Sequence, residues 1–95
     1  MLQYKAGYKF VEGGVHTQVL DFPEAITCGA DLDEARRMLA SALIDVAETR
    51  WEFGEALPLP DSSATNSEMD IEEPIYLHLT ASSSVSRIPA GVVVP

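Results

Sequence analysis

Apolar and polar residues alternate from the start of the chain. In the segment 4–11 (YKAGYKFV), aromatic residues and Ala6 occupy even positions, and lysines or glycine occupy the odd positions between them. This period of two predicts a strand with one buried face. The residues expected on that face are Tyr4, Ala6, Tyr8 and Phe10.

Glycine and proline divide the next segment into two further strands. Gly13 and Gly14 tolerate the positive φ angles of a tight hairpin, so the chain is expected to return as a strand over Val15–Leu20. Pro23 ends this strand because it offers no backbone donor. A short third strand is predicted over Ala25–Cys28, and the second strand is expected to bury Val15, Thr17 and Val19.

The period then changes to that of a helix. Asp31 stands three residues before Glu34, a spacing typical of a capping box, and Gly54 is a typical helix stop. A helix over Leu32–Phe53 follows, with Arg50 expected to complement its C-terminus at the sheet edge. At 100° per residue, one stripe faces the sheet: Leu32, Ala35, Leu39, Ala42, Leu43 and Val46. The opposite stripe is solvated: Glu34, Arg37, Ser41, Asp45, Glu48 and Glu52.

A second apolar stripe runs between these two faces of the helix. It consists of Ala40, Ile44, Ala47 and Trp51. One interpretation is that a later strand, the tail or a long loop of the same chain covers it. The other is that the stripe binds a second subunit, with Trp51 as its anchor. The second interpretation, together with unprotected sheet edges, predicts a homodimer or a higher oligomer.

The remaining third of the chain predicts one more strand. An acidic, polar loop is expected over Asp61–Glu73, followed by a strand over Ile75–Ala81 whose residues alternate between the two faces. The last residues, 82–95, are predicted to be an edge strand or disordered. We therefore expect one α+β domain over residues 1–81, with element order β-β-β-α-β and one long helix on a four-stranded, mostly antiparallel sheet.

Composition restricts the partners that the protein can bind. The net charge is −9 and the isoelectric point is about 4.4, so the chain repels nucleic acid and favours a basic protein. A single cysteine excludes an internal disulfide, and no apolar run approaches the ~20 residues of a membrane span. We expect a cytoplasmic protein that does not enter membranes.

No catalytic or metal-binding constellation is predicted. Among the acidic residues, Asp21 lies near a strand end, whereas Glu12 and Glu24 lie in turns, so a converging two-metal site is not expected. Cys28 is interpreted as a buried structural thiol. His16 and His78 are expected on the outer face of the sheet, about 10 Å apart, too far to share a metal ion. Lys5 and Lys9 would make that outer face mildly basic.

Several turn, cap and core residues together resemble a known family. They are Asp21-Phe22-Pro23, Thr27, Gly29, Leu32, Glu34-Ala35 and Gly54-Glu55 followed by Pro58 and Pro60. This pattern resembles the HicB family of antitoxins over residues 4–60. The chain departs from the family pattern at Glu24 and Ala25, where glycine and commonly cysteine are expected.

The resemblance implies a partial ribonuclease H-like fold without nuclease activity or cofactor. It also implies a partner, a small basic ribonuclease toxin of the HicA type. Contact residues for such a partner are expected on the acidic helix face, at Asp45, Glu48 and Glu52. Many relatives carry a C-terminal DNA-binding module, but the residues after Pro60 have no helical period, so operator binding is not expected of this chain. The alternative is an oligomeric scaffold or small-ligand domain of the same fold without a toxin.

Overall fold

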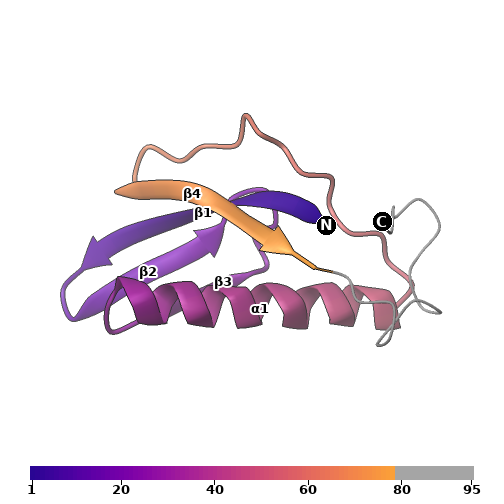
Figure 1. The fold of residues 1–95 in the computed structure, drawn as a ribbon, viewed down its shortest axis with the longest axis horizontal. Helices are drawn as coiled ribbons and strands as arrows, with labels where there is room; N and C mark the ends of the chain where they lie inside the picture. The colour runs from indigo at the N-terminus through magenta and orange to yellow at the C-terminus, as the bar shows by residue number, and fades with distance from the viewer. Residues whose placement is uncertain (79–95) are drawn as a thin grey trace.

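The protein folds as a four-stranded antiparallel sheet with one long helix across one face (Figure 1). The computed structural model describes residues 1–78, so the predicted strand positions 79–81 and the tail 82–95 lie outside the described residues. The elements are β1 (Leu2–Val11), β2 (Gly14–Val19), β3 (Ile26–Gly29), α1 (Leu32–Glu52) and β4 (Ile71–Leu77). The sheet order is β3-β2-β1-β4, which confirms the predicted α+β class and element order.

The hairpin between β1 and β2 sets the register of the sheet. Val11 pairs with Gly14, which leaves a tight turn in which Gly13 has a φ of +84°. On the helix side, Tyr4, Ala6 and Tyr8 are buried as predicted. The prediction for Phe10 is wrong, because its side chain is 52% exposed. Figure 1 shows the reason: the hairpin extends beyond the first turn of α1, so no helix covers its end.

Both ends of α1 follow from local sequence. The Glu34 backbone N–H donates to Asp31 Oδ1 (2.8 Å), and the Ala30 N–H donates to Glu34 Oε1 (2.8 Å), which confirms the predicted cap. Gly54, with a φ of +71°, ends the helix. Among the described residues, no helix combines the length and the apolar composition that crossing a membrane requires.

The buried stripe of α1 differs from the predicted one. Its members are spaced four residues apart, and each step of four advances about 40° beyond a full turn, so the stripe winds around the helix. The buried residues are Ala35, Leu39, Leu43, Ala47 and Trp51. Leu32, Ala42 and Val46, which were also predicted to face the sheet, are only half-buried.

Strand β4 begins earlier than predicted. The acidic segment expected to be a loop up to Glu73 is already paired with β1 from Ile71, where Ile71 lies opposite Tyr8. The hydrophobic pattern did not predict this earlier start, because two consecutive glutamates, Glu72 and Glu73, interrupt the alternation of apolar and polar residues. In the sheet they lie on opposite faces, and each finds a cation. Pro74 sits in this strand because β4 is an edge strand.

The segment between α1 and β4 crosses the sheet face that α1 leaves free. Figure 1 shows it arching over β1 and β4 on the side away from the helix. This segment lies close to β1 at Gly7: a Cβ atom added there would be 2.7 Å from Met69 Cγ of the segment and 3.2 Å from Leu20 Cδ2. Glycine at position 7 therefore allows this segment to lie against the strand. Strand β1 is therefore covered on its outer face at Gly7, whereas the outer face of β4 stays exposed at Glu72, Pro74 and Tyr76.

Candidate functional site

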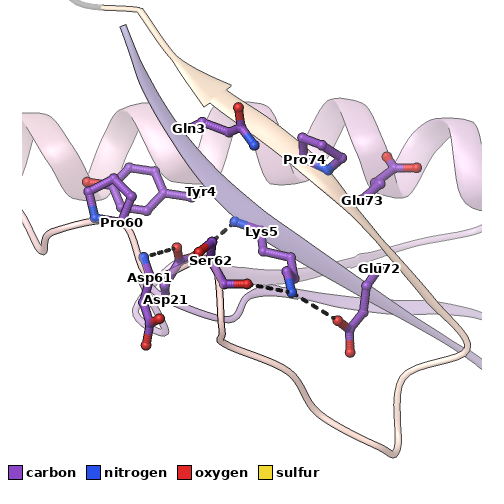
Figure 2. A pocket seen from close by; sticks show the side chains of 10 residues that line it. All are labelled: Gln3, Tyr4, Lys5, Asp21, Pro60, Asp61, Ser62, Glu72, Glu73 and Pro74. Atoms are coloured by element: carbon purple, nitrogen blue, oxygen red, sulfur yellow. Dashed lines mark hydrogen bonds and ion pairs between the residues drawn. The ribbon is translucent and has the colours of Figure 1, made fainter.

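A pocket of about 600 Å³ lies where the segment after α1 meets strands β1 and β4 (Figure 2). Lys5 reaches across this pocket, with its Nζ 3.5 Å from Glu72 Oε1 and donating to the Ser62 carbonyl (3.3 Å). The lining includes four acidic residues and one lysine, but the carboxylate of Glu73 lies on the helix side, where it pairs with Arg36. It consists of Gln3, Tyr4, Lys5, Asp21, Pro60, Asp61, Ser62, Glu72, Glu73 and Pro74.

The Asp21 carboxylate joins three parts of the chain at this pocket. Its Oδ1 accepts from the Lys5 backbone N–H (2.9 Å) and its Oδ2 from the Asp61 backbone N–H (2.9 Å), as Figure 2 shows. Both oxygens are thus occupied by backbone donors. Asp21 fastens the start of the acidic loop to β1, so its position near a strand end has a structural explanation.

Tyr4 supports the same junction from the helix side. Its hydroxyl donates to the Pro58 carbonyl (2.7 Å), and its ring meets Phe22 edge-on with a centroid distance of 5.5 Å. Burial, with a further contribution from Asp21, raises the pKa of Tyr4 to about 12. The phenol therefore stays protonated and serves as a hydrogen-bond donor.

The outer face of β1 is electrically neutralised. Lys9 Nζ lies 3.6 Å from Glu68 Oε1, and Lys5 pairs with Glu72. The pKa of Glu72 is lowered, chiefly by the hydrogen bond from the Asn66 backbone N–H. The expectation of a basic outer face is therefore wrong: β4 supplies a carboxylate to Lys5, and the loop before it supplies one to Lys9.

Two arginines of α1 hold the helix to the rest of the fold. Arg36 donates to both carboxylate oxygens of Glu73 (3.0 and 2.8 Å), and its guanidinium lies 5.9 Å from the centre of the Tyr8 ring. The hydrogen bonds from Arg36 lower the pKa of Glu73, whereas burial, together with Glu73, raises the pKa of Tyr8 to about 12. Arg36 was not among the residues predicted from the sequence to have a role. Its charge is opposite to that of Glu73, but the pairing could not be predicted without knowing that β4 places Glu73 beside α1.

Arg50 forms the second of these attachments. It pairs with Glu24 in the turn before β3 and donates to the Ala56 carbonyl (3.0 Å) just after the helix. Its guanidinium lies 5.3 Å from the centre of the Phe22 ring. The predicted role of Arg50 at the helix C-terminus is confirmed, and Glu24 has a partner in the fold rather than a place in a metal site.

Histidine and cysteine positions also separate rather than converge. Leu2 pairs with Leu77 and Lys9 with His16, so His16 and His78 lie about eight residues apart along the sheet, roughly 27 Å at about 3.4 Å per residue. The expected separation of about 10 Å was too small because it counted only the spacing between strands and not the distance along them. Cys28 is exposed, which corrects its interpretation as a buried thiol.

Acidic side chains do not converge either. Within residues 1–78, no group of three or more histidine, cysteine, aspartate or glutamate residues is arranged to hold a metal ion. Of the three carboxylates considered for catalysis, Asp21 and Glu24 are engaged as described, and Glu12 is exposed in the hairpin turn. The geometry of the described residues offers no support for ribonuclease H chemistry.

The acidic residues expected to contact a partner share one exposed face of α1. Asp45, Glu48 and Glu52 are all exposed and follow one another at spacings of three and four, so they are neighbours on the helix surface. Ile44, 46% exposed, adjoins them. Together they form an acidic surface with an apolar border, and whether a partner binds there stays a prediction.

The second apolar stripe is divided by the fold. Ala47 and Trp51 are buried, Trp51 with 6% exposure, in the same core as Leu57 and Leu77. The interpretation that the chain itself covers them is therefore correct for these two residues, and Trp51 is not available as an anchor. Ala40 and Ile44 are exposed.

Comparison with known proteins identifies this architecture. No protein-family model matches the chain, and no curated protein matches its sequence. Among solved structures, the N-terminal domain of the Burkholderia pseudomallei antitoxin HicB matches with a TM-score of 0.64 and 16% identity, over 82% of this chain and 100% of that domain. The longer Burkholderia pseudomallei antitoxin HicB matches with a TM-score of 0.68 and 18% identity, over 100% of this chain and 76% of that one. The protein therefore has the fold of the antitoxin HicB.

Proposed function

We propose that this protein is an antitoxin that binds and neutralises a small, basic ribonuclease toxin of the HicA type. The observation that carries the proposal is the match of its fold to the antitoxin HicB, which covers an entire N-terminal HicB domain. The fold alone is compatible with other activities. A second property supports the same conclusion: the net charge of −9 suits a basic protein partner.

The proposed mechanism is binding without turnover. The toxin approaches a negatively charged surface, and Asp45, Glu48 and Glu52 on α1 steer it, because their exposed charges attract a basic protein over about a Debye length. The antitoxin itself cleaves nothing and acts in the cytoplasm. Neither operator DNA nor a cofactor takes part in its action.

Co-expression with the basic product of an adjacent reading frame tests the proposal. A stable complex should form, and RNA cleavage by the purified toxin should fall in proportion to the antitoxin added until the binding sites are filled. The pure antitoxin should cleave no RNA with or without Mg²⁺. A neighbouring basic protein that cleaves RNA equally well with the antitoxin present would refute the proposal.

Charge reversal locates the binding surface. Asp45→Lys with Glu48→Lys should slow association roughly tenfold at low salt and weaken its salt dependence. The matched control is Glu12→Lys with Glu55→Lys, which changes the net charge equally at exposed positions in the hairpin turn and just after the helix. Equal slowing by both pairs would assign the effect to net charge and remove α1 from the interface.

A second candidate is an oligomeric scaffold or small-ligand domain, favoured by the pocket beside Lys5 and by the exposed Ala40 and Ile44. In this second candidate function, the protein acts as the homodimer expected from the sequence. Sedimentation equilibrium of the wild type and of Ile44→Glu tests it: a monomeric wild type at tens of micromolar refutes self-association. A dimer that Ile44→Glu does not weaken would place the contact elsewhere.

A further inference from the structure

The two edges of the sheet differ in what their backbones offer. Lys5 directs both backbone groups toward β2, since its N–H donates to Asp21 (2.9 Å) and its carbonyl accepts from the Leu20 N–H (2.8 Å). Pro74 lies opposite Lys5 on β4, so its backbone nitrogen points away from β1, toward the edge. Because proline has no N–H, the middle of the β4 edge lacks a donor.

Strand β3 forms the other edge and has no such protection. The Val19 N–H donates to the Ala25 carbonyl (2.9 Å), so odd-numbered residues of β2 direct their backbone groups toward β3. Thr17 pairs with Thr27, which therefore faces β2. Alternation then turns the N–H and carbonyl of both Ile26 and Cys28 outward.

These outward groups are accessible. Ile26 is 48% exposed and Cys28 is exposed as well. Within residues 1–78, no hydrogen bond to another group satisfies the outward N–H or carbonyl of either residue. The helix packs on the inner face of the sheet at β3, where Gly29 lies against Ala35. An extended segment can therefore approach the edge without displacing α1.

Carboxylates lie at both ends of this edge. Glu24 comes just before β3, and its side chain is 49% exposed although it pairs with Arg50. Asp31 and Asp33 follow the strand, and the side chain of Asp33 is 84% exposed although its Oδ1 lies 3.7 Å from Arg36 Nη1. With a net charge of −9, a second copy of the chain would meet like charge here, whereas a basic segment would meet opposite charge.

We infer that the β3 edge binds an extended, basic segment of the partner protein by strand addition. The inference rests on the proposed function and names the contact through which the toxin is held. Ile26 and Cys28 supply two donors and two acceptors, so backbone pairing provides affinity. Lysine or arginine side chains of the added strand meet the flanking carboxylates and provide the preference for a basic partner.

Amide exchange with a defined peptide tests the edge directly. The probe is a capped peptide of about ten alternating threonine and lysine residues, longer than a typical strand of about six. It should slow exchange of the Ile26 and Cys28 amides about tenfold or more and leave the Glu72 and Tyr76 amides on the other edge unchanged. A glutamate version of the peptide should give no protection. Absence of binding at millimolar peptide, protection elsewhere, or equal protection by the glutamate peptide would overturn the inference.

Proline substitution provides a matched pair of variants. Cys28→Pro removes one outward donor without removing a bond to β2, and it should weaken peptide and toxin binding about 2- to 10-fold, the usual worth of one hydrogen bond. Tyr76→Pro makes the same change on the β4 edge and should bind as the wild type does. Circular dichroism and thermal melts check that both variants fold. Equal binding by the wild type and Cys28→Pro would overturn the inference.

The complex with the toxin separates this inference from the proposed function. If the toxin is neutralised but the Ile26 and Cys28 amides stay unprotected in the complex, the function stands and the edge contact is wrong. If the basic peptide protects the edge but no toxin is bound, the function fails instead, and the edge remains a site for basic strands. Protection that rises with protein concentration alone would assign the edge to a second copy and overturn the partner proposed here.

Discussion

The two faces of the sheet are covered by different means. On the inner face, α1 buries a stripe of apolar residues spaced four apart, from Ala35 to Trp51. On the outer face, the segment before β4 is held mainly by polar contacts: the bond of Asp21 to Asp61, the bond of Lys5 to the Ser62 carbonyl, and the ion pair of Lys9 with Glu68. The comparison teaches that one cover derives its stability from area removed from water and the other from individual polar pairs. The two should respond differently to mutation.

The largest expected effect is on the inner face. Leu39→Ala or Leu43→Ala should lower the free energy of unfolding by about 2–5 kcal/mol, because each side chain is fully buried and its loss leaves a cavity. Urea denaturation measures the change. Ile44→Ala is the control on the same helix, and its exposed side chain should cost far less. Similar losses at positions 43 and 44 would contradict the assigned core.

A smaller effect is expected where the outer cover comes closest. Gly7→Ala should destabilise the protein by about 1–3 kcal/mol, because the added methyl group would overlap Met69. Met69→Ala in the same chain should recover part of this loss, and the double-mutant cycle measures the coupling. Additive effects of the two substitutions would show that this segment does not lie on β1.

A polar substitution tests the fastening of the outer cover. Asp21→Asn should cost about 1–2 kcal/mol, because an amide has only one acceptor oxygen for the two backbone donors of Lys5 and Asp61. Amide exchange at Asp61 should accelerate more than exchange in β2. Asp33→Asn, on an exposed side chain, provides the control. Uniform acceleration throughout the sheet would mean that Asp21 supports the whole fold rather than this cover.

The smallest expected effect is on pH dependence. Arg36 lowers the pKa of Glu73 in the folded state, so the unfolded state binds a proton more readily. The stabilisation is present above the unfolded value of about 4.3 and is lost as pH falls through the lowered folded pKa. Glu73→Gln should flatten the loss of stability that occurs as pH falls through and below about 4.3. An unchanged slope in Glu73→Gln would assign the acid sensitivity to other carboxylates.

Periodicity explains why the inner face could be predicted from sequence. Alternation on β1 and β2 and the cap at Asp31 depend on neighbours within a few residues, so local sequence determines them. The end of the buried stripe was harder, because Trp51 shares its core with Leu57 and Leu77, which follow α1 in the chain and are not considered by a helical wheel. Its burial depends on where distant segments lie.

The outer cover carried no comparable signal. Glu72 and Glu73 look like one acidic run in the sequence, and only pairing with β1 sends one toward Lys5 and the other toward Arg36. The difference between the two edges of the sheet was hidden for the same reason. A proline inside a strand predicts an edge, but the direction of its missing donor follows from the register of Lys5 and Pro74.

Pro74 also determines how far assembly through the sheet could grow. Fibres that lengthen by strand addition need two receptive edges on every molecule, one to accept the preceding molecule and one to present to the next. In the described sheet, only the β3 edge is receptive along its length, because the β4 edge lacks a donor at its centre. Strand addition at β3 would therefore stop after a single pairing, because the described sheet offers no second complete edge for the next molecule.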